Sequence, residues 1–403
     1  MNKLKILNDP IYGFITIPNS QVFDLIQHKY FQRLRRITQM GMSYLVYPGA
    51  HHTRFHHAIG CVHLMQQTVN VLRFKGVTIS DDEEKALYVA ILLHDIGHGP
   101  FSHAMEHSVV NNVSHEQISL LFMERLNEEF NGSLTLAIQI FKGEYSRKFM
   151  CQLISGQLDM DRADYLKRDS FYTGVAEGNI NSERLITMLN VVHDELVVEE
   201  KGVYSVEKFI IARRLMYWQV YLHKTGVAAE LLLSNLMDYV RSMVFAGKLK
   251  EIPDDLLYFF SKKETAQIDQ ALLERFSRLD DIDILACLKK WQDHPDQILS
   301  SYASRIINRR LMKVKFQDQP FTEKQIEKKK VKLIRQGYSK AYADRFVFSG
   351  TINTRPYSLE KSPIKILLKS GQVKPLEVFS DLFKGGAFTT LESKSYLCYA
   401  KAE

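Results

Sequence analysis

The segment LLHDIGHGPFSH, residues 92–103, is the feature that most constrains how this chain can fold. It places three histidines, one aspartate and two glycines in twelve positions, at the end of a helix that we expect to be buried. A capping box at Ser80 and Glu83 predicts the start of that helix, an apolar stripe gives it an inward face, and Gly97 predicts its end. Burying an unpaired carboxylate costs several kcal/mol, so Asp95 needs a cationic partner. A divalent metal ion meets that need.

The histidines gather in one part of the chain, because ten of the 14 lie between His51 and His115. Clusters of this kind are typical of metal binding. A helix predicted after Thr53, ending at Gly76, turns His57 inward. His94 then supplies a second nitrogen next to Asp95. A further acid is expected from QLDMDRADYLKRD (157–169), which offers the four candidates Asp159, Asp161, Asp164 and Asp169. On a helix Asp161, Tyr165 and Asp169 share one face.

The remaining pattern predicts a mainly α fold with small β-hairpins. Helical periodicity runs from about residue 20 to about 245, and a second capping box begins a helix at Ser114. Hairpins are expected at residues 5–19, at 195–206 around Lys201-Gly202, and at 364–379 around Ser370-Gly371. We therefore expect a helical domain over residues 1–240 and a mixed α+β lobe over 241–403, with subunit contacts made by that lobe.

Composition is that of an ordinary globular protein, with 45% apolar and 25% charged residues. The four cysteines are far apart and form no CxxC pair, so neither a disulfide framework nor a zinc knuckle is predicted. No apolar stretch has the length of a membrane span or a signal peptide core, and we expect a soluble, cytoplasmic protein.

Positive charge is concentrated in residues 301–350, which hold 13 Lys and Arg against four Asp and Glu. The whole chain has a net charge of +7, so the rest is nearly neutral. Such a region suits nucleic acid, a phosphorylated ligand or an acidic partner. The alternative is a solvated helix face, which the run EKKKVKLIR (327–335) resembles equally well.

Five ordered blocks carry a family resemblance. The segments NDPIYG, FQRLRRITQMG, YPGAHHTRFHH, LLHDIGHGPFSH with SHEQ, and LDMDRADYLKRD resemble the HD-domain metal-dependent phosphohydrolases. More narrowly, they are similar to deoxynucleoside triphosphate triphosphohydrolases of the SAM-and-HD-domain and bacterial dGTPase type. The resemblance runs to about residue 180 and returns only at 213–225. It implies an HD-domain helical core.

The resemblance implies a role for each matching position. The implied metal ligands are His57, His94, Asp95 and Asp161, a set suited to Mn, Fe, Ni, Zn or Mg. The implied catalytic groups are His98, His103, Glu106, His115 and Glu116. We assign His103 to protonation of the leaving 5′ oxygen and His98 to the transferring phosphate, with the other three as a proton network. The implied substrate contacts are Gln39 and Asp169 at the sugar 3′-hydroxyl, Tyr165 under the ribose, Arg54 and Arg162 at the phosphates, and Arg213 and Tyr221 as an extension.

The pattern departs from the family at four places. Glu106 and Arg162 stand where the best-known relatives carry Asp and Lys, and Met40 replaces a leucine beside the sugar. Regulated relatives use an acid just before FQRLR to bind an activating nucleotide, and here that residue is Gln27. Because Arg35 is retained, a nucleotide activator stays among the expectations, as does a homo-oligomer, dimer or tetramer.

The sequence thus predicts metal-dependent hydrolysis of dNTPs to deoxynucleoside and inorganic triphosphate. One alternative is a phosphohydrolase acting on a nucleoside monophosphate or cyclic dinucleotide. Another is a nucleic-acid or nucleotide-binding protein that keeps the metal for structure. Single residues also have simpler interpretations: Glu116 as a helix-dipole partner, His103 with His107 as a surface pair, and Arg54 and Arg162 as surface ion pairs.

Overall fold

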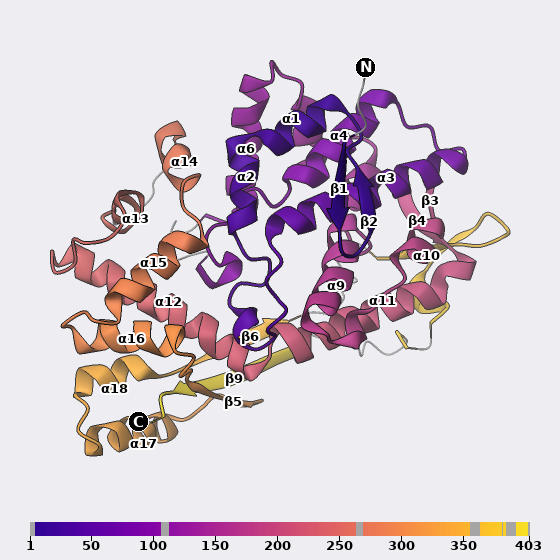
Figure 1. The fold of residues 1–403 in the computed structure, drawn as a ribbon. Helices are drawn as coiled ribbons and strands as arrows, with labels where there is room; N and C mark the ends of the chain where they lie inside the picture. The colour runs from indigo at the N-terminus through magenta and orange to yellow at the C-terminus, as the bar shows by residue number, and fades with distance from the viewer. Residues whose placement is uncertain are drawn as a thin grey trace.

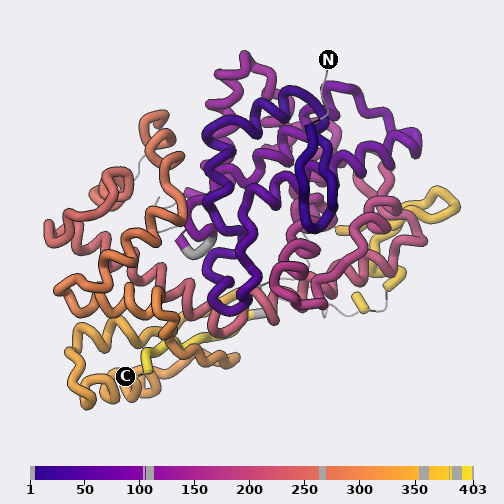
Figure 2. The backbone as a smooth tube through the Cα atoms, viewed as in Figure 1, coloured from indigo at the N-terminus to yellow at the C-terminus, as the bar shows by residue number. Residues whose placement is uncertain are grey.

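The computed structural model describes residues 5–105, 113–262, 269–354, 363–380, 382–383 and 392–401, and is mainly helical with small sheets (Figures 1 and 2). This confirms the predicted fold class. In the described residues no helix is both long and apolar enough to cross a lipid bilayer.

The N-terminal part places a hairpin against a group of helices. The hairpin pairs β1 (Ile6–Asp9) with β2 (Gly13–Thr16). The helices are α1 (Ser20–Gln27), α2 (Lys29–Gln32), α3 (Arg54–Phe74), α4 (Asp81–Leu93), α6 (His115–Glu129), α7 (Thr135–Phe141), α8 (Lys148–Ile154), α9 (Met160–Thr173), α10 (Ser182–Thr187) and α11 (Val203–Met216). Short 3₁₀ turns lie at η1 (Arg33–Arg36), η2 (Ser43–Leu45), η3 (Ser102–Met105) and η4 (Ala176–Gly178).

The long helix α12 (Lys224–Phe245) runs from this part to the C-terminal helices (Figure 1). These are α13 (Asp254–Phe260), α14 (Gln270–Phe276), α15 (Asp281–Trp291), α16 (Gln297–Ile307), α17 (Glu323–Arg335) and α18 (Lys340–Phe346). Beside them β5 (Lys313–Gln317), β9 (Glu392–Tyr399) and β6 (Val347–Thr354) form an antiparallel sheet in that order. The predicted boundary near residue 240 falls inside α12, and the division into two domains stays a prediction.

A second sheet joins distant parts of the chain. It contains β3 (Leu189–Val192), β4 (Glu195–Glu199), β7 (Lys365–Leu367) and β8 (Val373–Pro375) in that order. The strand β7 pairs in parallel with β4, so the yellow segment of residues 363–380 in Figure 2 lies against the N-terminal part. The last short turn, η7 (Leu376–Val378), follows β8.

Local signals placed three helix starts correctly. The N-cap at Thr53 and the capping boxes at Ser80 and Ser114 begin α3, α4 and α6, as predicted. The hairpins at the N-terminus and around Ser370-Gly371 are also confirmed.

The hairpin predicted around Lys201-Gly202 is wrong. The turn lies instead at His193-Asp194, which joins β3 to β4 with φ of 50° and 57°. Two consecutive positive φ angles match the twist of a two-residue hairpin, and the Asp tolerates that conformation. Lys201 and Gly202 form a 3₁₀ turn, η5 (Glu200–Gly202), that leads into α11.

A glycine sets the close packing of α3 on α9. A Cβ on Gly60 would collide with the carboxylate of Asp164 and the guanidinium of Arg168. Both of those side chains are fully buried on α9. The two helices therefore hold their charged groups at a spacing that only glycine permits at this position.

We expect Gly60→Ala to lower the free energy of unfolding by about 2 to 4 kcal/mol, because the added methyl group has to displace a buried ion pair. Gly226→Ala is the matched control, since Gly226 lies in α12 with open space around its Cβ position. That control should be neutral or stabilise by about 0.5 to 1 kcal/mol. Chemical denaturation of both variants measures the difference. Equal stabilities would contradict the close approach.

Candidate metal centre and adjoining pocket

Four side chains converge where three helices meet. His57 lies on α3, His94 caps the end of α4 and is followed by Asp95, and Asp161 lies in the first turn of α9. The Nε2 atom of His57 is 3.1 Å from Asp161 Oδ1 and 3.6 Å from Asp95 Oδ2. The Nε2 atom of His94 is 3.5 Å from Asp95 Oδ1 and 3.6 Å from Asp161 Oδ1. The predicted ligands thus lie within one ion's reach of each other.

Hydrogen bonds on the far side of each ring orient these nitrogens. His57 Nδ1 is 2.8 Å from Asp164 Oδ2, and Asp164 in turn accepts two hydrogen bonds from Arg168. His94 Nδ1 donates to the carbonyl oxygen of Ile91 at 2.7 Å. When Nδ1 carries the proton, the lone pair of a neutral imidazole is on Nε2. A carboxylate or carbonyl behind the ring is the usual support of a metal-binding histidine.

Two imidazole rings and two carboxylates share this cluster, and Arg54 pairs with one of the carboxylates, Asp95. His94 Nε2 is buried with no hydrogen-bond partner in the described residues. Burial opposes a charge on His57, yet Cys61, Asp161 and Asp164 raise its pKa well above the ordinary value. Burial likewise opposes a charge on Asp161, but His57 and His94 hold the pKa of that carboxyl far below its usual range. A divalent metal ion would bring further positive charge to the two carboxylates, and the nitrogen and oxygen donors suit a first-row transition metal.

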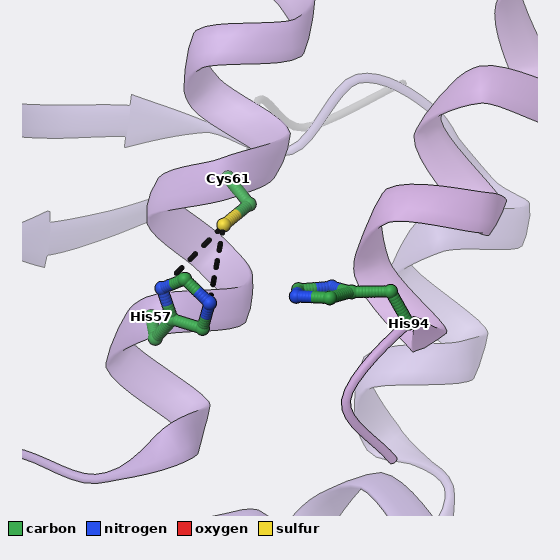
Figure 3. A group of neighbouring side chains, drawn as sticks. All are labelled: His57, Cys61 and His94. Carbon is green, nitrogen blue, oxygen red and sulfur yellow. Dashed lines mark hydrogen bonds between the residues drawn. The ribbon is translucent and has the colours of Figure 1, made fainter. Parts of the chain in front are cut away.

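Cys61 is a neighbour that the donor set does not need. It lies one turn beyond His57 on α3, and Figure 3 shows His57 and His94 facing the same space beneath its sulfur. Its Sγ is 3.5 Å and 3.6 Å from the two ring nitrogens of His57. Burial raises the pKa of this thiol. We therefore assign Cys61 to packing and the two carboxylates to the ion.

We expect Cys61→Ala to keep its metal, because the four nitrogen and oxygen donors remain. Asp161→Ala should lose it, with at least about tenfold weaker binding. Metal content of the purified proteins, followed by titration of the metal-free proteins with Mn²⁺, measures both. Loss of metal in the cysteine variant would instead place sulfur in the coordination sphere.

The predicted catalytic histidines lie beside this cluster. His98 Nε2 is 3.3 Å from Asp95 Oδ1, and its ring stacks on that of His115 with centroids 3.9 Å apart. His115 and Glu116 begin α6, and both line the cavity described next. The side chain of His103 and the whole of Glu106 lie outside the described residues.

A cavity of about 530 Å³ opens next to the cluster. Each of the seven predicted substrate contacts lines it: Gln39, Arg54, Arg162, Tyr165, Asp169, Arg213 and Tyr221. Asp95, Asp161, His98, His115 and Glu116 line it as well. The fold thus brings segments from residue 39 to residue 221 around one space, which is large enough for a nucleotide.

Arginine side chains contribute positive charge to the lining of the cavity. Arg54 is buried, donates to Ser102 Oγ at 2.8 Å and pairs with Asp95. Arg162 pairs with Asp159, the N-cap of α9. The Nε atoms of Arg162 and Arg213 are buried with no hydrogen-bond partner in the described residues. Arginines with unused donors in the lining of a cavity favour an anionic ligand.

The lining of the cavity also contains aromatic and acidic side chains. Asp169 accepts from Tyr221 Oη at 2.7 Å and lies 2.7 Å from His52 Nε2. Tyr221 ends a π-helical turn, η6 (Tyr217–Tyr221), between α11 and α12. Such turns are frequent at functional sites because they shift side chains around the helix axis. The Tyr165 ring lies 6.2 Å from that of Tyr221.

Sequence reasoning missed several residues of this site. His52 is not among the predicted contacts, yet it is 1% exposed and its Nε2 atom lies 2.7 Å from Asp169 Oδ1. Ser102 links Arg54 to the carbonyl oxygen of Thr38. Glu230 of α12 lines the cavity. His52 directly precedes the segment TRFHH of the family resemblance, and this position was a usable signal. For Glu230 no local signal exists.

Glu230 is a pocket carboxylate that titrates near neutrality, since burial raises its pKa from 4.5 to about 7. The stability that comes with its bound proton is complete below about pH 4.5 and is lost as the pH rises through about 7. We expect Glu230→Gln to be more stable than the wild type at pH 8 by about 1 to 2 kcal/mol, with no difference at pH 4.5. Denaturant unfolding at both pH values measures this. Glu124→Gln, at an exposed position of α6, controls for the loss of one carboxylate.

Comparisons with known proteins agree with this geometry. A sequence model of the HD domain matches residues 54–169, and one of the HD associated region matches residues 180–272. The uncharacterized protein YwfO of Bacillus subtilis is 33% identical over 394 residues, covering 93% of this chain and 88% of that protein. The chain belongs to the HD-domain phosphohydrolase family.

Two further relatives bear on the activity. The crystal structure of a phosphohydrolase from Bacteroides thetaiotaomicron is 46% identical with a TM-score of 0.95, and the match covers 99% of this chain and 100% of that one. A Dictyostelium discoideum homologue of SAMHD1, named as a deoxynucleoside triphosphate triphosphohydrolase, is 29% identical over 67% of this chain and 54% of its own length.

Proposed function

We propose that this protein is a metal-dependent triphosphohydrolase that splits a dNTP into deoxynucleoside and inorganic triphosphate. One observation carries the proposal: a single cavity contains the candidate metal carboxylates, guanidinium groups with unused donors, and an aspartate held by His52 and Tyr221. These three features suit phosphates and a sugar hydroxyl of the same molecule. The named activity of the Dictyostelium relative supports it.

The chain's residues have separate tasks in this reaction. Arg54, Arg162 and Arg213 bind phosphate oxygens, and Gln39 and Asp169 accept or donate hydrogen bonds at the sugar. Gln39 Oε1 is buried with no hydrogen-bond partner in the described residues, which leaves it available for a ligand. The ring of Tyr165 packs under the deoxyribose.

His57, His94, Asp95 and Asp161 would hold the metal ion, which when bound would neutralise phosphate charge and lower the pKa of water. Water adds to the α-phosphorus, the bond from phosphorus to the 5′ oxygen breaks, and His103 protonates that oxygen. His98 contacts the transferring phosphoryl group from beside Asp95, and Glu106, His115 and Glu116 relay protons to the two histidines. The products are a deoxynucleoside and a triphosphate.

Three further expectations extend the proposal beyond the pocket. We propose a homo-oligomer, with a nucleotide as activator. The basic region 301–350 is a proposed nucleic-acid contact, whose binding would weaken steeply with salt. Part of its charge is already engaged, since Lys330 pairs with Asp344 and Lys329 lies over the Tyr399 ring.

We expect metal-loaded protein to release deoxynucleoside and intact triphosphate from at least one dNTP, and Asp95→Ala to lower the rate at least about a hundredfold. Each dNTP, NTP and dNMP is incubated separately and as a mixture with Mn²⁺, Mg²⁺, Fe²⁺ or Ni²⁺, and products are resolved by ion exchange. Cys61→Ala is the control, because it changes a neighbour of His57 without removing a donor.

Other product patterns decide among the alternatives. Orthophosphate from monophosphates alone would show a nucleotidase. A cyclic dinucleotide is incubated in the same way, and its cleavage would show a phosphodiesterase. Activity only in the mixture would show an activating nucleotide. No hydrolysis of any dNTP, alone or mixed, contradicts the proposal.

A further inference from the structure

An aspartate from the C-terminal helices reaches the wall of the catalytic pocket. Asp281, the first residue of α15, is 4% exposed and accepts three hydrogen bonds from two separate loops. The backbone N–H of Phe101 donates at 2.6 Å, and the backbone N–H and the hydroxyl of Thr38 donate at 2.8 Å each. Asp281 lies outside both matched regions, residues 54–169 and 180–272.

Both loops carry residues of the proposed site. Thr38 directly precedes Gln39, and the Phe101 loop lies between His98 and His103. Gln39, His98 and Phe101 itself line the cavity. A carboxylate has two oxygens, and here one serves each loop, so a single side chain fixes the distance between them.

The second loop has a backbone that needs such support. Phe101 and Ser102 have φ of 51° and 50°, the left-handed region that bulky residues rarely adopt. Backbone strain of this kind persists only when surrounding contacts hold it. The hydrogen bond from Phe101 N–H to Asp281 is one such contact.

The network continues from these loops to the candidate metal centre. Ser102 Oγ donates to the carbonyl oxygen of Thr38 at 2.9 Å and accepts from Arg54 Nε at 2.8 Å. Arg54 in turn pairs with Asp95. A continuous series of hydrogen bonds therefore runs from α15 to a candidate metal ligand.

Arg33 makes a second link between the same parts. It is fully buried, and its Nη1 donates to the carbonyl oxygen of His98 at 2.8 Å and to that of Leu279 at 3.3 Å. Its Nη2 donates to the carbonyl oxygen of Ile96 at 3.0 Å. Residues 279–281 thus hold the segment that follows Asp95 through two independent side chains.

We propose that Asp281 is a positioning residue of the active site, which holds the Gln39 loop and the Phe101 loop in the arrangement that hydrolysis requires. This inference rests on the proposed function. It also means that the C-terminal helices complete the pocket, so that the matched HD segment alone lacks a part of the catalytic framework.

Asp281→Asn tests this with almost no change in size, because an amide has only one acceptor oxygen and turns N–H groups toward one of the loops. Asp280→Asn is the matched control: Asp280 is the adjacent buried residue, pairs with Arg36 and caps α15, a role that asparagine also fills. Assays run at pH 8, because burial raises the pKa of Asp281 to about 6 and the wild type is then ionised.

We expect Asp281→Asn to lower kcat/KM about tenfold to a hundredfold, mostly in kcat, for the dNTP that the wild type hydrolyses fastest. Asp280→Asn should stay within about threefold. Hydrogen exchange should accelerate in peptides covering residues 37–41 and 99–102 in the first variant alone. Asp281→Glu, which keeps both oxygens, should recover part of the activity.

The two readouts separate this inference from the proposed function. Exchange at the wild-type rate, or faster exchange with unchanged kcat/KM, overturns the role of Asp281. A loss of activity that only follows the unfolded fraction at the assay temperature overturns it as well. If the wild type hydrolyses no dNTP, the proposed function fails, and the exchange comparison by itself decides whether Asp281 holds the loops.

Discussion

The structure depends on two carboxylates, the buried Asp95 and the partly exposed Asp161, that lie against the Nε2 atoms of two histidines. Two carboxylates and two imidazole nitrogens at this spacing repel one another unless a cation or protons lie between them, and Arg54 compensates part of the charge on Asp95. The surrounding side chains fix the orientation of the two histidine rings. Asp164 accepts a hydrogen bond from Nδ1 of His57, and the carbonyl oxygen of Ile91 accepts one from Nδ1 of His94. Arg168 compensates the charge of Asp164. Gly60 lets α3 approach α9 closely enough for these contacts.

The pocket also contains buried polar atoms that have no hydrogen-bond partner in the described residues. Arg162 and Arg213 keep donors unused, as Gln39 keeps an acceptor, while Asp169 is held on both sides by His52 and Tyr221. A site that leaves some buried polar atoms unpaired selects ligands that pair them, because the alternative is a lost hydrogen bond. Asp169, which is held by its neighbours, therefore has a fixed position, whereas the unpaired atoms of Arg162, Arg213 and Gln39 favour a ligand that forms hydrogen bonds with them.

The C-terminal helices are part of this arrangement. Asp281 contacts the Thr38 and Phe101 loops directly, Leu279 is linked to His98 through Arg33, and Glu230 brings a carboxyl from α12 into the cavity. The five sequence blocks that carry the family resemblance lie within residues 8–169, whereas the likeness to the Bacteroides phosphohydrolase, at 46% identity, covers 99% of the chain. The residues that hold a site in place can lie far from the motif that identifies it. The reason is that hydrogen-bond partners of a loop can come from any element of the fold.

The sequence by itself determined the helix starts and the candidate ligands on them. Capping boxes at Ser80 and Ser114 and the pair His94-Asp95 act within one or two helical turns, so local pattern suffices to find them. It also narrowed the acids to the four aspartates of residues 157–169.

Only the tertiary structure decided what each aspartate does. Asp159 caps α9, Asp161 faces the two histidines, Asp164 supports His57 from behind, and Asp169 lies in the pocket with Tyr221. Their order along one helix could not distinguish them, because each role depends on a partner more than fifty residues away or on the exact helix start. The same holds for Asp281, which lies 180 residues from Phe101 in sequence. The turn at His193-Asp194 was missed for a different reason: glycine favours positive φ strongly, and a neighbouring Gly202 drew the prediction away from it.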